Sequence, residues 1–212
     1  MIAIIDYKAG NLTSVARAVQ YLGFACKITS DPREIQAAER VIFPGVGAAG
    51  SAMADLKAMG LDEAIRKFYT SGKPLLGICL GTQIILNFSE ENGTTCMGLI
   101  PGKVKRFPQP LMNSSGESLK VPHMGWNSVQ FKRDHPVLEG VPKDSQFYFV
   151  HTYFPEPTAM ENILGLTEYG IFFPSAIARK NLAAFQFHPE KSGPPGLKIL
   201  DNFCRWEGTH AD

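Results

Sequence analysis

Short strand-like runs alternate with helical patterns along the first hundred residues of the chain. Strand candidates fall at residues 2–5, 24–29, 41–43 and 74–79. Val15, Val19 and Leu22 recur at helical spacing after the first run, and Gly23 ends that helix. Residues 51–69 supply a second helix before the last run. This alternation of strand and helix predicts a parallel sheet with helices on its faces.

The pattern changes after about residue 97, where strands are separated by turn-rich loops. The strand candidates there are residues 98–107, 128–131, 146–154 and 163–167, and they predict a mixed or antiparallel extension. Residues 197–206 form a closing amphipathic helix, and residues 108–118 are a candidate surface loop. The sequence contains no repeat, low-complexity tract or convincing linker. We predict one α/β domain over residues 1–212, an open, mainly parallel sheet flanked by helices with an antiparallel extension.

Composition narrows the possible partners and compartments. Of the 212 residues, 44% are hydrophobic and 19% are charged, which is typical of a globular protein. The net charge of +1 gives no electrostatic reason to expect nucleic acid or an anionic membrane as partner. No apolar span approaches the roughly 20 residues of a membrane helix, and the chain start lacks a basic signal-peptide region. The four cysteines show no metal spacing, so we expect a reduced cytoplasmic protein without metal or cofactor.

Candidate chemistry begins with the segment Gly77-Ile78-Cys79-Leu80-Gly81, where a strand runs into a helix-like stretch over residues 82–88. Glycines on both sides of a central residue permit the tight turn of a nucleophile elbow, here with cysteine in place of serine. Cys79 would lie at a helix N-terminus, where thiolate is favoured, and the Leu80 N–H would face a developing oxyanion. The segment alone fits a small buried packing cysteine equally well.

A second segment, Ala184-Phe185-Gln186-Phe187-His188-Pro189-Glu190, supplies the partners that a cysteine nucleophile needs. A histidine must take and return a proton, and an acid must hold its tautomer and orientation. His188 and Glu190 are two positions apart, so an extended backbone would point them to the same side. Cys79, His188 and Glu190 therefore form a candidate catalytic triad.

These two segments resemble the paired signatures of the class I (triad) glutamine amidotransferases, whose fold is flavodoxin-like. Further segments are similar to the glutaminase subunits of imidazole glycerol phosphate synthase: Asp6-Tyr7-Lys8-Ala9-Gly10-Asn11, Phe43-Pro44-Gly45-Val46-Gly47, Val121-Pro122-His123-Met124-Gly125-Trp126-Asn127, Phe149-Val150-His151-Thr152-Tyr153 and Lys191-Ser192. They run from residue 6 to residue 192, so the resemblance covers almost the whole chain. Thr82 departs from it, because methionine is expected there.

The resemblance implies roles for further residues. Gly45, Val46 and Gly47 would complete the oxyanion hole with Leu80, in a loop that changes conformation when a partner binds its acceptor. Gln83, Glu91 and Tyr148 would contact glutamine. Tyr7, Lys8, Asn11, Trp126, Asn127 and Lys191 would form a partner-facing rim around the triad. Without the resemblance, the glycine loop is more simply a tight turn, and Gln83, Glu91 and Tyr148 are more simply solvated or core residues. His123 and His151 are interpreted as structural or interfacial.

The chain shows no Walker pattern and no synthetase domain, so an acceptor for ammonia must lie on another protein. The resemblance implies a heterodimer with a (β/α)8-barrel cyclase subunit, which makes imidazole glycerol phosphate and aminoimidazole carboxamide ribonucleotide in histidine biosynthesis. L-Glutamine would be the substrate of the present chain. A glutaminase of another pathway such as vitamin B6 synthesis, a triad peptidase and a non-catalytic regulatory subunit are the alternatives.

Overall fold

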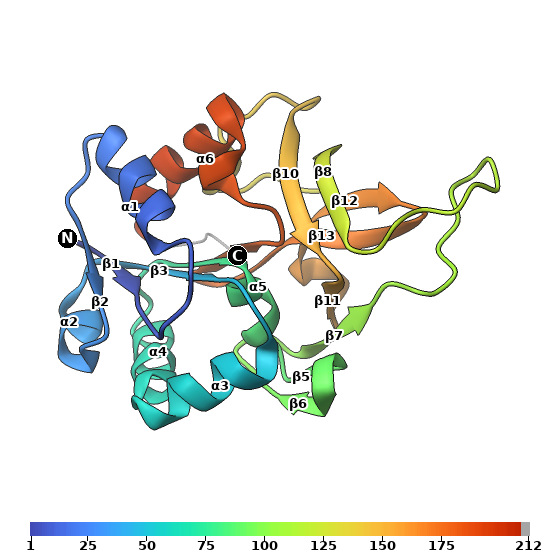
Figure 1. Cartoon of the computed structure of the whole chain (residues 1–212). Helices are drawn as coiled ribbons and strands as arrows, with labels where there is room; N and C mark the ends of the chain where they lie inside the picture. Colours follow the sequence, from blue (N-terminus) through green and yellow to red (C-terminus); the bar gives the residue numbers. More distant parts are fainter. Residues whose placement is uncertain (209–212) are drawn as a thin grey trace.

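The computed structural model describes residues 1–208, and within them an eight-stranded mixed sheet forms the centre of the molecule (Figure 1). Its parallel part runs in the order β2 (Cys26–Thr29), β1 (Ile2–Ile5), β3 (Arg40–Gly45), β4 (Leu75–Cys79) and β14 (Leu182–Phe185). It continues antiparallel through β13 (Ile171–Arg179), β12 (Ile163–Tyr169) and β9 (Gln130–Phe131). The predicted α/β fold, mainly parallel with an antiparallel extension, is confirmed.

Helices cover both faces of the parallel strands (Figure 1). Alternate side chains of one strand point to opposite faces, so Ile2 and Ile4 pack with α1 (Leu12–Tyr21) and α6 (Gly193–Arg205). Ala3 and Ile5 pack on the other face with α3 (Ala49–Ala58) and α4 (Leu61–Thr70). Burial on both faces explains why these strands appear in the sequence as nearly continuous apolar runs.

The helix predicted over residues 51–69 is two helices, α3 and α4. Gly60 separates them with φ +66°, a left-handed backbone that glycine adopts at low cost. A short helix, α2 (Pro32–Ala37), was missed by the apolar pattern because only Ile35 is buried in it. Its start is nevertheless encoded locally, since the Asp31 carboxylate accepts a hydrogen bond from the Arg33 N–H at 2.8 Å and Pro32 stands at the first position.

The second half of the chain adds two smaller sheets among the described residues. One pairs β10 (Gln146–His151) with β8 (His123–Ser128), and the other has the order β11 (Tyr153–Pro157), β7 (Gly102–Arg106), β5 (Phe88–Ser89), β6 (Thr94–Thr95). Short 3-10 turns complete the elements: η1 (Glu91–Gly93), η2 (Pro136–Leu138), η3 (Met160–Asn162) and η4 (Pro189–Lys191).

Several predicted boundaries were wrong. The strand expected over residues 146–154 is broken at Thr152, and each part joins a different sheet. The helix expected over residues 82–88 is the shorter α5 (Leu80–Ile84), and β13 was not predicted. Residues 108–118 lie outside helices and strands apart from an isolated Met112–Ser118 bridge, as expected of a loop. Within residues 1–208 no helix has both the length and the apolar character needed to cross a bilayer.

Sheet order places the candidate chemistry at the carboxyl ends of the parallel strands. Gly45 at the end of β3 pairs with Cys79 at the end of β4. On the other side of β4 lies β14, whose last residue Phe185 pairs with Ile78. The chain after β14 therefore returns next to Cys79, although more than a hundred residues separate the two in sequence.

Candidate active site

Cys79 lies at a strained turn between β4 and α5. Its backbone has φ 54° and ψ −109°, which side-chain-bearing residues rarely adopt. Glycines on both sides make room for the turn: a Cβ on Gly81 would lie 1.9 Å from the Phe43 carbonyl oxygen, and one on Gly77 would lie 2.9 Å from the Ala184 Cβ. The predicted strand–turn–helix arrangement around Cys79 is confirmed, and it has the geometry of a nucleophile elbow.

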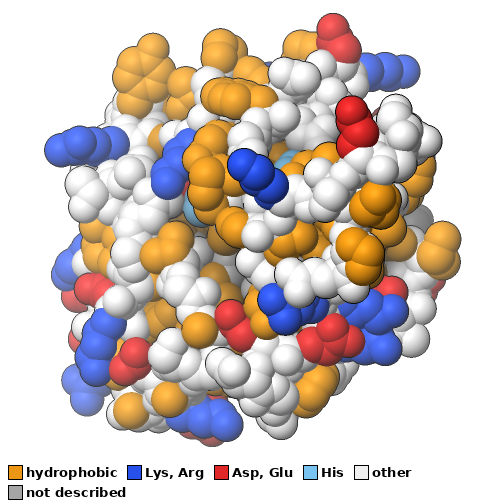
Figure 2. All heavy atoms as spheres, turned by 45° about the vertical axis from the view of Figure 1, so that its right-hand side comes forward, with side chains coloured by type: hydrophobic (Ala, Val, Ile, Leu, Met, Phe, Trp, Pro, Cys, Tyr) orange, Lys and Arg blue, Asp and Glu red, His pale blue; other side chains and the backbone are white. Residues whose placement is uncertain are grey.

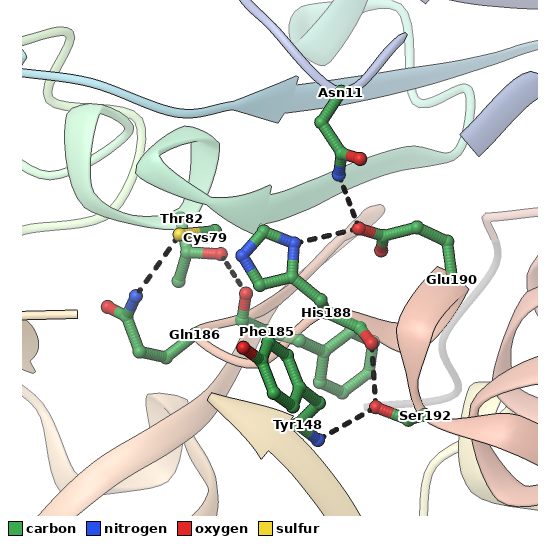
Figure 3. A network of polar contacts seen from close by, with 9 residues as sticks. All are labelled: Asn11, Cys79, Thr82, Tyr148, Phe185, Gln186, His188, Glu190 and Ser192. Atoms are coloured by element: carbon green, nitrogen blue, oxygen red, sulfur yellow. Dashed lines mark hydrogen bonds and ion pairs between the residues drawn. The ribbon is translucent and has the colours of Figure 1, made fainter. Parts of the chain in front are cut away.

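Thr82 ties this elbow to the neighbouring strand. Its side chain is fully buried, and its hydroxyl donates a hydrogen bond of 2.6 Å to the Phe185 carbonyl oxygen (Figure 3). The departure from methionine at this position therefore adds a buried hydrogen bond between the elbow and the strand that leads to His188.

His188 and Glu190 come together beside Cys79. His188 Nδ1 lies 2.7 Å from Glu190 Oε1, and both side chains are buried. Asn11 Nδ2 donates to the same Glu190 oxygen at 2.5 Å, and the other imidazole nitrogen, Nε2, points toward the Cys79 sulfur (Figure 3). Because a carboxylate can only accept, Nδ1 carries a proton and Nε2 is the atom that exchanges one with the sulfur. The three predicted triad residues are thus adjacent and correctly ordered.

The environment of His188 favours its charged form. Burial lowers the pKa of His188, but the hydrogen bonds and negative charges of Cys79 and Glu190 together raise it to about 9. An imidazolium beside a cysteine sulfur is the partner that a thiolate requires. The arrangement can therefore support nucleophilic attack by sulfur followed by proton donation from His188.

A pocket of about 370 Å³ opens in front of Cys79. It is lined by Val46, Gly47, Cys79, Leu80, Gln83, Glu91, Pro122, Val150, His151, Thr152, Tyr153 and His188. Three of the predicted oxyanion residues line it, namely Val46, Gly47 and Leu80, and Gly47 has φ +102°. Gly45 is not among the lining residues, but it pairs with Cys79 at the ends of β3 and β4. Gly45 has no room for a side chain, because its Cβ would lie 2.0 Å from the Tyr7 hydroxyl oxygen.

Two of the three predicted glutamine contacts line the pocket. Gln83 is buried in its wall, and Glu91 accepts a hydrogen bond of 2.6 Å from the Ala49 N–H at the start of α3. Tyr148 is not among the lining residues, and its ring packs edge-on against Trp126 with centroids 6.2 Å apart. Its contact with glutamine stays a prediction.

The predicted rim residues divide into exposed and buried ones. Lys8 and Lys191 are exposed, Trp126 is 55% exposed, and Asn127 is partly buried on β8. Tyr7 was wrongly placed on this rim, because its side chain is only 2% exposed and packs against Phe43 with ring centroids 5.5 Å apart. Tyr7 is buried because its ring belongs to the core cluster that Ala3 and Ile5 of β1 form with α3 and α4.

Asn11 was also assigned to the rim, yet its side-chain amide is directed at Glu190. Sequence reasoning gave it no place in the triad, because 179 positions separate the two residues.

Other residues near the sulfur were given no catalytic role from the sequence, and His123 and His151 were interpreted as structural or interfacial. Gln186 is fully buried, and its Nε2 donates to the Cys79 sulfur at 3.8 Å (Figure 3). His151 lines the pocket and pairs with His123, with 2.9 Å between His123 Nδ1 and His151 Nε2. The only available signal for Gln186 was its position two residues before His188 on an extended segment, which puts both on one side. Over residues 1–208, no three His, Cys, Asp or Glu side chains are grouped so as to hold a metal ion.

Comparison with known proteins identifies the family to which this site belongs. The family model described as "Glutamine amidotransferase class-I" matches residues 3–206. The chain is a class I glutamine amidotransferase.

Relatives of this amidotransferase match it over their whole length. The "Imidazole glycerol phosphate synthase subunit HisH" of Nitratidesulfovibrio vulgaris (strain DP4) is 49% identical over 212 residues, covering 100% of this chain and 99% of the relative. The protein of that name from Methylococcus capsulatus is 49% identical over 210 residues, with 97% and 96% covered.

Solved structures agree with the fold of the amidotransferase. One described as a glutamine amidotransferase has a TM-score of 0.72 at 17% identity, covering 96% of this chain and 100% of the other. A structure of PurLQS from Thermotoga maritima has a TM-score of 0.71 at 19% identity, with 96% and 97% covered.

Proposed function

We propose that this amidotransferase is the glutaminase subunit of an imidazole glycerol phosphate synthase, which hydrolyses L-glutamine and delivers the ammonia to a cyclase subunit. The observation that carries the proposal is the meeting of Cys79, His188 and Glu190 at one pocket. The similarity over full length to proteins named imidazole glycerol phosphate synthase subunit HisH supports the assignment to histidine biosynthesis.

The reaction begins when the Cys79 thiolate attacks the side-chain amide carbon of glutamine. Negative charge then develops on the amide oxygen, where the Leu80 N–H and the loop of Gly45, Val46 and Gly47 supply donors. His188 gives its proton to the departing nitrogen, and ammonia leaves as the tetrahedral intermediate collapses to a γ-glutamyl thioester. Water, deprotonated by His188, attacks the thioester, and glutamate and the free sulfur are regenerated.

Glu190 keeps His188 in the state that this cycle requires. Its carboxylate accepts from Nδ1, which leaves Nε2 facing the sulfur, and its negative charge stabilises the imidazolium. Asn11 holds the carboxylate from the opposite side, so it acts through Glu190 and not on the substrate.

Glutamine recognition falls to acceptor groups in the pocket wall. The NH2 group of Gln83 is already bonded to the Tyr153 carbonyl oxygen and to Gln186, so its Oε1 remains for the substrate. With the carboxylate of Glu91, this oxygen suits the α-ammonium group of glutamine. Tyr148 is retained as a proposed third contact.

The partner is proposed to be a (β/α)8-barrel cyclase that covers the rim of the pocket in a heterodimer. Ammonia is mostly protonated in neutral water, so delivery requires a sealed contact between the two proteins. Lys8, Asn11, Trp126, Asn127 and Lys191 form the proposed rim. Figure 2 shows hydrophobic side chains interspersed with lysine and arginine on the side of the molecule that carries β8 and β13. A cytoplasmic location is part of the same proposal.

The test is glutamate release from glutamine by the purified chain, alone and with the cyclase subunit, each with and without the cyclase's ribonucleotide substrate. We expect weak activity alone and strong stimulation in the liganded complex, because the oxyanion loop switches when the acceptor is bound. Cys79→Ala should abolish hydrolysis while leaving thermal unfolding and cyclase binding intact, and Cys26→Ala serves as the matched control. Full activity without the cyclase would show that the oxyanion loop does not act as a switch. Activation only by a different synthase would show that the chain serves another pathway.

A further inference from the structure

The backbone carbonyl oxygen of Tyr153 is the point from which the hydrogen positions around the pocket can be assigned. Gln83 Nε2 lies 2.9 Å from this oxygen, and His151 Nδ1 lies 2.8 Å from it. A carbonyl oxygen only accepts hydrogen bonds, so both nitrogens must carry a hydrogen. This removes the usual ambiguity in the orientation of the glutamine amide and in the tautomer of the histidine.

One branch of the network leads from Gln83 to the nucleophile. Gln83 Nε2 also lies 3.0 Å from the side-chain oxygen of Gln186. Because Gln83 presents its NH2 group, Gln186 must present its oxygen, and the NH2 group of Gln186 is turned toward the Cys79 sulfur at 3.8 Å (Figure 3). Gln186 is fully buried and so has no competing contact with bulk water.

The other branch leads from His151 toward the surface and is consistent with the same assignment. With Nδ1 protonated, neutral His151 accepts at Nε2 from His123 Nδ1 at 2.9 Å. His123 then accepts at Nε2 from Asn127 Nδ2 at 3.3 Å. Burial lowers the pKa of His123 to about 4 and that of His151 to about 3, so both rings are neutral as the pattern requires.

We infer that Gln186 is a further catalytic residue, whose amide donates a hydrogen bond to the Cys79 thiolate. His188 faces the sulfur from one direction and Gln186 from another, so the charged sulfur has two donors in a buried site. The donor is held in place by Gln83 and Tyr153 before the reaction starts, so no reorganisation is needed when the thiolate forms. Gln186 stabilises the attacking thiolate by this hydrogen bond and holds the sulfur toward the pocket.

The inference is tested by alkylation of Cys79 with iodoacetamide across a range of pH, followed by mass spectrometry of the peptide that contains Cys79. This assay needs neither glutamine nor a partner, so it remains informative even if the proposed function is wrong. The titratable groups facing the sulfur or sharing its pocket are Tyr7 after β1, Glu91 in η1, His151 in β10, Tyr153 in β11, and His188 with Glu190 after β14. They are the same in wild type and in the variants.

Gln186→Met removes the donor at similar side-chain volume. We expect the midpoint of the alkylation profile to rise by about one pH unit, the value of one hydrogen bond to a charged group. Gln186→Glu, which adds a negative charge beside the sulfur, should raise the midpoint further. Gln36→Met is the control, because Gln36 is a partly buried glutamine on α2, away from the site, and its side chain donates to the Ala64 carbonyl of α4.

A midpoint equal to that of wild type, in whichever Gln186 variant retains cooperative thermal unfolding, overturns the inference. A shift of the same size in Gln36→Met would also overturn it, because the effect would then be general. In the glutaminase assay, which rests on the proposed function, Gln186→Met should lower kcat about tenfold with KM unchanged.

Discussion

At the scale of single residues, the site depends on side chains that hold one another in a defined protonation state. His188 is kept charged by Cys79 and Glu190, whereas His123 and His151 are kept neutral by burial. The difference arises because His188 has a carboxylate partner, and the pair of His123 and His151 has only an amide and a carbonyl. These three histidines would look alike in a sequence window, but their different surroundings in the fold give them different charges.

Glu190→Gln should lower kcat for glutamine hydrolysis by roughly 10²- to 10⁴-fold, because the amide no longer stabilises the imidazolium or selects the correct tautomer. The measurement is glutamate release in the complex with the cyclase. Glu161→Gln, an exposed position in η3, is the control and should behave as wild type. Wild-type activity in Glu190→Gln would exclude its role as the triad acid.

The buried histidine pair should make the fold sensitive to acid. Unfolded histidine takes up a proton near pH 6.5, whereas folded His123 and His151 resist protonation until about pH 4 and 3. The unfolded state therefore binds more protons as pH falls below 6.5, and the free energy of unfolding decreases. Urea unfolding at pH 7.5 and pH 5 should show a loss on the order of 1–2 kcal/mol greater for wild type than for His151→Gln. Equal losses in the two proteins would contradict a neutral buried His151.

At the scale of elements, the elbow depends on close approach of α5 to β3. The backbone of Gly81 lies so near the Phe43 carbonyl that a Cβ would overlap it, and the Phe43 backbone belongs to a central strand that cannot move aside. Strand order places the histidine, because β14 lies next to β4 and the chain after β14 brings His188 beside Cys79. Neither contact is visible in the local pattern of the strand or of the helix.

Gly81→Ala should destabilise the protein by on the order of 3 kcal/mol, because the new methyl group must displace main-chain atoms of β3. Gly50→Ala in α3 is the control: its Cβ would meet only Thr94 Oγ1, at 3.4 Å, so stability should be kept or slightly raised. Denaturant unfolding measures both. Similar free energies of unfolding for the two variants would show that the elbow can relax.

At the scale of the whole molecule, large apolar side chains are exposed on β8 and β13. Met124 is 62% exposed and Trp126 is 55% exposed on the same strand, β8, while Phe172 on β13 is 55% exposed. Large exposed side chains of this kind are typical of a surface that another protein covers. The network from Asn127 through His123 and His151 begins on β8, so this surface is joined to the pocket by hydrogen bonds.

Trp126→Ala should weaken binding of the cyclase subunit by roughly 30-fold or more, about 2 kcal/mol, because a large aromatic anchor is lost. Isothermal titration calorimetry measures the affinity. Tyr21→Ala is the matched control, an aromatic residue that is 79% exposed on α1 and is not part of the proposed rim. Unchanged affinity in Trp126→Ala would show that the cyclase binds another part of the surface.

The sequence by itself determined the alternation of strands and helices, the elbow around Cys79 and the pairing of His188 with Glu190. These depend on neighbours within a few positions: glycines for the turn, apolar runs for buried strands, and spacing of two for one side of an extended chain. The single domain was also predicted in this way and stays a prediction.

Only the tertiary structure decided which distant residues complete the site. Asn11 contacts Glu190, Gln186 contacts Cys79, and Tyr7 is buried, because strand order and the return of the chain beside β4 set these contacts. The protonation of His151 is likewise set by the fold, because its Nδ1 lies against the Tyr153 carbonyl oxygen and the ring is buried. Burial and long-range hydrogen bonds are properties of the folded chain, so no window of sequence contains them.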